Sequence, residues 1–87
     1  MQLKKGKLAY ALLFNDMGMW FDLVRIEEVY NGGNPWIKGW TFSSDYQESV
    51  KVEQTFVFQH KMDLVNYLKS TLDGMITELY SDKWPDI

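Results

Sequence analysis

A chain of 87 residues with no cysteine and a net charge of −3 predicts one small domain, and it excludes disulfides, thiolate metal sites and thiol nucleophiles. Its pI near 4.9 disfavours a protein that binds nucleic acid through the phosphate backbone, because such proteins need a basic surface. Cysteine-free chains suit a reducing compartment, so we expect a cytoplasmic protein that forms one domain over residues 1–87, with loosely ordered ends at 1–6 and 81–87.

The first predicted strand covers Lys7–Asn15. Both of its faces are apolar, with Tyr10 and Leu12 on one side and Ala9 and Ala11 on the other. This pattern is typical of a strand that is covered on both sides, but an apolar face left open by the rest of the fold would instead be an interface. The apolar run is much shorter than the ~20 residues that span a bilayer as a helix, so we expect no membrane association.

A turn over Asn15–Gly18 leads to the second predicted strand, Met19–Tyr30. Asn and Asp side chains bond to their own backbone in turns, and Gly accepts positive φ. The alternation of this strand changes phase, since Phe21 and Leu23 lie on one face whereas Val24 and Ile26 lie on the other. A β-bulge near Arg25–Glu28 would restore the phase by inserting one residue.

Asn31–Pro35 is the strongest turn signal of the chain, because its Asn-Gly and Gly-Gly pairs favour the positive φ of tight hairpins. Trp36–Ser43 follows as the third predicted strand. Trp36, Lys38, Trp40 and Phe42 share one of its faces. Gly39 within the strand indicates a bulge or a close approach of another backbone.

Val50–Gln59 is the fourth predicted strand, with an apolar face interrupted by Gln54. Lys61–Tyr80 then has an apolar stripe at a spacing of three and four, which predicts one helix despite the unfavourable Gly74. Trp84, next to Pro85, could fold back onto the sheet or stay loose. The sequence therefore predicts an α+β fold in ββββα order, a four-stranded antiparallel sheet with one C-terminal helix on one face.

Catalytic constellations are missing from the sequence. His60 is the single histidine, and its place between strand and helix favours a capping or surface role. Gly32-Gly33 lacks the residues that follow in a phosphate-binding loop. We therefore expect no enzyme activity, no metal and no cofactor.

The leading hypothesis is a protein that binds, and inhibits, another protein through its aromatic sheet face or edge. The residues selected for this role are Trp20, Arg25, Tyr30 and Trp36, because Trp, Tyr and Arg dominate interface hot spots. The compact, cysteine-free build is similar to that of small bacteriophage accessory proteins, which implies an accessory or anti-defence role. Two alternatives stay open, a nucleotide or other small-ligand pocket at a homodimer interface, and a homodimer without ligand.

Overall fold

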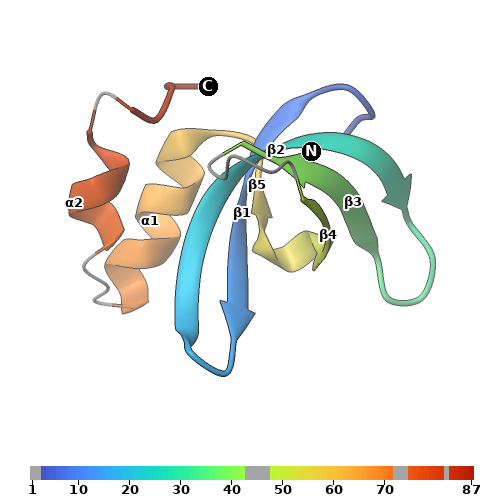
Figure 1. Cartoon of the computed structure of the whole chain (residues 1–87), viewed down its shortest axis with the longest axis horizontal. Helices are drawn as coiled ribbons and strands as arrows, with labels where there is room; N and C mark the ends of the chain where they lie inside the picture. The colour runs from blue at the N-terminus through green and yellow to red at the C-terminus, as the bar shows by residue number, and fades with distance from the viewer. Residues whose placement is uncertain (1–2, 43–47, 72–74, 82) are drawn as a thin grey trace.

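The computed structural model describes residues 3–42, 48–71, 75–81 and 83–87. The chain is α+β with an antiparallel sheet, as predicted, but it has five strands and two short helices instead of four and one (Figure 1). The elements are β1 (Leu8–Asn15), β2 (Gly18–Tyr30), β3 (Trp36–Thr41), β4 (Ser49–Glu53), the 3-10 turn η1 (Gln54–Phe56), β5 (Val57–Phe58), α1 (Lys61–Thr71) and α2 (Met75–Leu79).

The strands lie in the order β4-β3-β2-β1-β5. Consecutive strands β4 and β5 therefore occupy opposite edges, and η1 carries the chain from one edge to the other. The sheet curls so that these two edges approach each other (Figure 1). Our prediction of one continuous strand over Val50–Gln59 was wrong, because the chain leaves β3 at Gln54 and pairs with β1 through β5.

The curl has two local causes in β2 and β3. The register of the β2–β3 pair shifts between Ile26 and Glu28, which confirms the predicted bulge, and bulges bend a strand and increase its twist. Gly39 pairs with Ile26, and a Cβ at Gly39 would lie 2.9 Å from the carbonyl oxygen of Arg25. Gly39 is thus a point of close backbone approach, as its position in the strand predicted.

The inside of the curled sheet forms one of two apolar clusters. Its buried members come from all five strands: Ala9, Ala11, Val24, Ile26, Ile37, Val52 and Val57. Ala9, Ala11 and Ile37 are completely buried. The second apolar face of the first strand is therefore covered by the sheet itself at Ala9 and Ala11, so these two residues are not open to a partner.

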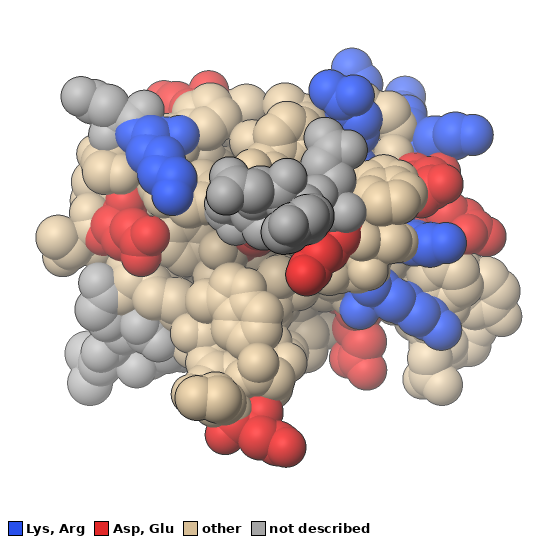
Figure 2. Space-filling view, in the orientation of Figure 1, with Lys and Arg blue, Asp and Glu red and all other residues tan. Residues whose placement is uncertain are grey.

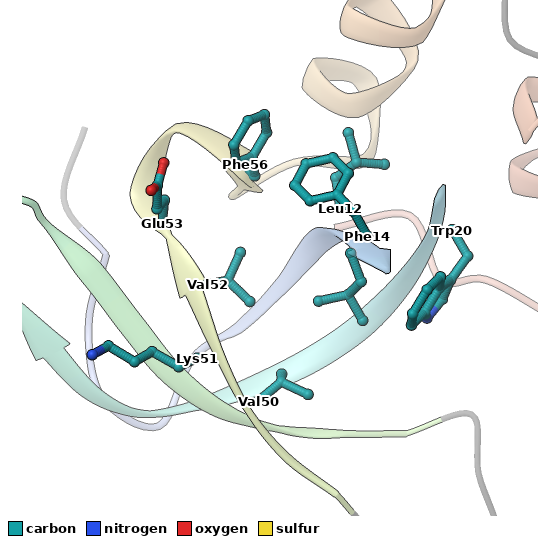
Figure 3. A pocket seen from close by; sticks show the side chains of 9 residues that line it. Leu12, Phe14, Trp20, Val50, Lys51, Val52, Glu53 and Phe56 are labelled. Atoms are coloured by element: carbon teal, nitrogen blue, oxygen red, sulfur yellow. The ribbon is translucent and has the colours of Figure 1, made fainter. Parts of the chain in front are cut away.

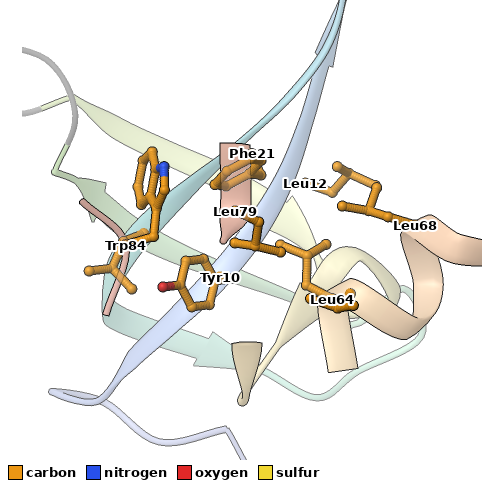
Figure 4. Close-up of a cluster of buried hydrophobic side chains, with 9 residues drawn as sticks. Tyr10, Leu12, Phe21, Leu64, Leu68, Leu79 and Trp84 are labelled. Atoms are coloured by element: carbon orange, nitrogen blue, oxygen red, sulfur yellow. The ribbon is translucent and has the colours of Figure 1, made fainter. Parts of the chain in front are cut away.

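The second cluster lies between the other face of β1–β2 and the helices (Figure 4). Leu64, Val65 and Leu68 of α1 are completely buried there, as is Leu79 of α2, so the predicted stripe does face the sheet. The structure has two helices where we predicted one. Residues 72–74, which include Gly74, lie outside the described residues, as do residues 43–47 between β3 and β4.

The C-terminal segment packs on the sheet, which corrects our expectation of a loose end. The Trp84 side chain is 6% exposed, and its ring centroid lies 4.8 Å from that of Phe21 and 6.3 Å from that of Tyr10. Tyr10 Oη donates a hydrogen bond to the carbonyl oxygen of Pro85. Lys61 Nζ donates to the Trp84 carbonyl at 2.9 Å, so the start of α1 also holds this segment.

The N-terminal segment is also bound to the sheet. Gly6 N donates to the Ile26 carbonyl at 2.7 Å, and Ile26 N donates to the Lys7 carbonyl at 2.9 Å. These bonds hold residues 4–7 beside the bulge, where we expected a loose end. In the part of the chain that the structure describes, neither helix has the length and apolar character needed to cross a membrane.

Candidate functional site

The outer surface of β2, β3 and β4 presents aromatic and basic side chains in rows across the strands. Arg25 pairs with Trp40, and Tyr30 pairs with Trp36, while Lys38 pairs with Lys51 on β4. We call this surface the aromatic–cationic face, and it consists of Arg25, Tyr30, Trp36, Lys38, Trp40, Phe42 and Lys51. Trp40, Phe42 and Tyr30 are 39%, 43% and 46% exposed, which is high for large apolar side chains.

A stack of rings forms one end of this face. The rings of Tyr30 and Trp36 lie 5.3 Å apart at an angle of 17°, and Lys51 Nζ lies 4.5 Å from the Trp36 ring centroid. Stacked rings and a cation over an indole each stabilise the arrangement by about 0.5–1.5 kcal/mol. The two aromatic side chains are therefore held in place before any partner binds.

The backbone beneath the stack is fixed by Gln54, the first residue of η1. Its side-chain nitrogen donates to the Tyr30 carbonyl at 3.0 Å, to Asn31 Oδ1 at 2.9 Å and, more weakly, to the Trp36 carbonyl at 3.4 Å. Gln54, the polar residue that interrupts the predicted fourth strand, thus joins η1 to the end of β2 and to the start of β3, on either side of the hairpin turn.

Gly32 lies directly under the Tyr30 ring. A Cβ at Gly32 would stand 2.1 Å from Tyr30 Oη, so no other residue leaves room for the ring in this position. Among the described glycines, Gly6 and Gly18 have positive φ. The positive φ that we predicted for the glycines of the hairpin turn is therefore wrong, and Gly32 is required for space instead.

Arg25, Trp40 and Phe42 form the other end of the face. The Arg25 guanidinium carbon lies 5.7 Å from the centre of the Phe42 ring, and Arg25 is directly across from Trp40. Residues 4–7 run beside this end and add three exposed lysines. Figure 2 shows basic side chains gathered toward the β2–β3 side of the molecule, with acidic side chains among them.

The charges across the strands are not matched. Glu28, Lys38 and Lys51 follow one another in a row across β2, β3 and β4, so two exposed lysines are direct neighbours. Like charges directly opposite each other destabilise a sheet. Lys38 has Glu28 opposite it on β2, whereas Lys51 lies on the edge strand, with no described strand beyond it to place a negative group opposite.

A groove separates β4 from the β1–β2 hairpin (Figure 3). Its volume is about 450 Å³. The lining residues are mostly apolar: Leu12, Leu13, Phe14, Trp20, Val50, Lys51, Val52, Glu53 and Phe56. Val50 and Val52 line the β4 side, whereas Lys51 and Glu53 point away from the groove (Figure 3).

The structure brings together three of the four residues selected from the sequence. Tyr30 and Trp36 are in contact, and Arg25 lies on the same face two rows away. Trp20, which is 41% exposed, lies apart from them and lines the groove. Trp40, Phe42 and Lys51 were missed, although the alternation of their strands placed them on the outer side.

Catalytic geometry is not evident in the part of the chain that the structure describes. No group of three or more His, Asp or Glu side chains there could hold a metal ion. His60 is exposed, and its carbonyl accepts a hydrogen bond from Asp63 N at 3.0 Å, which places it at the start of α1.

Comparison with protein-family models, with curated proteins and with solved structures gave no match for this chain.

Proposed function

We propose that this chain is a non-enzymatic protein that binds an acidic segment of another protein through its aromatic–cationic face. The observation that carries the proposal is the exposure of Tyr30, Trp40 and Phe42 on one side of the sheet. Large apolar side chains that remain in contact with water are typical of interaction surfaces. Trp, Tyr and Arg are also the residues that contribute most to binding energy at protein interfaces.

The preorganisation of these side chains supports the same proposal. Tyr30 is held by Trp36 and by the space at Gly32, and Arg25 lies over Phe42. Side chains that are already ordered lose less conformational entropy when a partner binds. The face is therefore suited to binding without prior rearrangement.

The charge of the face favours an acidic partner. Arg25, Lys38 and Lys51 lie on the face itself, with the exposed Glu28 and Glu53 among them, and Lys4, Lys5 and Lys7 are exposed next to its Arg25 end. The whole chain nevertheless has a net charge of −3, which opposes binding along a continuous phosphate backbone. A protein segment with a few carboxylates beside apolar residues fits this balance better than a nucleic acid does.

The test is a selection from a displayed library of random peptides, with the wild-type protein as bait. A variant that combines Trp36→Ala and Trp40→Ala serves for counter-selection, so that only peptides that bind the face are kept. We expect enriched peptides to contain Asp or Glu next to an apolar residue, and we expect Arg25→Gln to weaken their binding about tenfold, as the loss of one charged contact does.

Control titrations use oligothymidine and ATP. Enrichment of peptides without acidic residues, or equal binding to the counter-selected variant, would refute the proposal. If oligothymidine alone binds the face, the protein binds single-stranded nucleic acid. If ATP alone gives a thermal shift, the small-ligand hypothesis replaces the present one. The thermal unfolding of each variant shows whether a loss of binding is due to unfolding.

A further inference from the structure

The outer edge of β4 has backbone groups that no described strand pairs with. β4 is the last strand of the sheet, next to β3. Thr41 N donates to the Glu48 carbonyl, and Gln54 N donates to the Pro35 carbonyl. In an antiparallel pair, alternate residues direct both N–H and C=O toward the same neighbour. The N–H and C=O groups of Ser49, Lys51 and Glu53 therefore point away from β3.

The sequence of this edge is complementary to itself. When a second β4 lies antiparallel with Val52 opposite Val52, Lys51 comes opposite Glu53 of the second copy and Glu53 comes opposite Lys51. Both are positions whose backbone groups point outward, so each pair can exchange both of its hydrogen bonds. The alternative register, with Lys51 opposite Lys51, brings like charges together and is disfavoured.

The same pairing resolves the unmatched charges of the sheet. The row Glu28, Lys38, Lys51 ends in a lysine at the free edge. A Glu53 from a second copy would continue this row with a negative charge, and the two-fold axis would repeat the effect. Ser49, Lys51 and Glu53, whose backbone groups point outward, are all exposed residues.

The groove beside β4 supplies the apolar contacts. Its far wall includes Phe14 and Trp20, which are 51% and 41% exposed. An added strand would direct its own Val50 and Val52 to the same side as those of the first copy. In the register centred on Val52, its Val52 would lie beside the first copy's Val52 at the groove, while its Val50 would come opposite Gln54 of η1.

We propose that two copies of this chain associate through their β4 edges, antiparallel and centred on Val52, to form a symmetric homodimer with a continuous sheet. An unpaired strand edge is a ready template for strand addition, and a two-fold interface must be self-complementary. This dimer does not depend on the proposed function, and it would place two aromatic–cationic faces side by side.

The first test is sedimentation equilibrium from micromolar to millimolar concentration. We expect the wild-type protein to reach twice its mass of 10.3 kDa. Lys51→Glu and Glu53→Lys should each raise the Kd of the dimer by about tenfold or more, because each turns two attractive pairs into repulsive ones. An equimolar mixture of these two variants should associate as tightly as the wild type, since each charge then meets its opposite.

Glu53→Pro tests the role of the backbone. Glu53 has a φ of −62°, which proline adopts without strain, and the lost N–H is one that points outward. We expect a folded monomer, with Ser49→Ala as a dimeric control because Ser49 does not pair in the proposed register. A wild-type monomer at millimolar concentration would overturn the proposal. So would single charge reversals that leave the dimer intact, or a mixture of the two that stays monomeric.

Discussion

The Tyr10 hydroxyl donates a hydrogen bond to the carbonyl oxygen of Pro85 and so joins the first strand to the C-terminal segment. Burial, together with the nearby Asp86 carboxylate, raises the pKa of Tyr10 from 10.0 to about 12. The buried ring therefore strongly favours its neutral form. This relationship makes the attachment of the C-terminal segment sensitive to high pH.

The expected pH dependence has a definite sign. The unfolded chain loses the Tyr10 proton near pH 10 and the folded chain near pH 12. The stabilisation is thus fully present below pH 10 and is lost as the pH rises from 10 to 12, by roughly 2–3 kcal/mol. Urea unfolding of the wild type and of Tyr10→Phe across this range measures it. The free energy of unfolding of the wild type should fall by this amount relative to that of Tyr10→Phe as the pH rises from 10 to 12, and a constant difference between the two would contradict the assignment.

Trp84 should be one of the most sensitive positions of the fold. Its side chain is 6% exposed and lies against Tyr10 and Phe21. Trp84→Ala should lower the free energy of unfolding by about 3–5 kcal/mol. Trp84→Phe should cost much less, because the indole Nε1 is buried without a hydrogen-bond partner. Chemical denaturation measures the free energy of unfolding of both variants. Equal losses in Trp84→Ala and Trp84→Phe would mean that packing of an aromatic ring at this position is not the main source of the stabilisation.

Gly39 and Gly33 form a matched pair for testing the curl of the sheet. A Cβ at Gly39 would press on the Arg25 carbonyl oxygen, whereas a Cβ at Gly33 would have no neighbour within 4 Å. Gly39→Ala should destabilise the protein by about 1–3 kcal/mol through backbone displacement. Gly33→Ala should change the free energy of unfolding by less than about 0.5 kcal/mol. Similar melting temperatures for the two variants would show that the approach at Gly39 is not needed.

Gln54 should stabilise the Tyr30–Trp36 stack through the backbone. Its side chain bonds to both strands of the hairpin, so Gln54→Ala should cost about 1 kcal/mol. It should also reduce the near-UV circular dichroism that the stacked rings produce. Thr55→Ala, at an exposed neighbouring position, is the control and should leave both signals unchanged. An unaltered near-UV spectrum of Gln54→Ala would show that the Tyr30–Trp36 stack does not depend on the Gln54 hydrogen bonds.

Local patterns in the sequence were sufficient to predict most of β1, β2 and β3. Alternation placed Tyr10 and Ala9 on opposite faces correctly, and the bulge lies within the predicted range Arg25–Glu28. The switch from Phe21 and Leu23 to Val24 and Ile26 has another cause, because both faces of β2 are buried there. The alternation of faces and the bulge both depend on neighbours along the chain. The break at Gln54 was missed because β5 pairs with β1, far away in the sequence, and no local pattern contains that pairing. For the same reason, the sequence does not decide whether Trp84 is buried, since its site is formed by β1 and β2, far away in the sequence.

The candidate site was predicted only in part. Tyr30 and Trp36 flank a hairpin turn, so their pairing follows from the turn itself. Trp20 was selected for its residue type, but it stands at the opposite end of β2 from Tyr30 and faces the groove. The position of Lys51 beside Lys38 and over the Trp36 ring depends on the pairing of β4 with β3. The sequence alone does not give that pairing.

The short turn η1 has a consequence for how the chain tolerates change. Glu53 and Val57 are close in the sequence yet belong to opposite margins of the sheet, and three residues bridge them. A longer connection would allow β4 and β5 to separate, and water would then reach Val52 and Val57 inside the curled sheet. Insertions should therefore be accepted at the solvent-exposed hairpin tip around Gly33, and they should be rejected at this crossing.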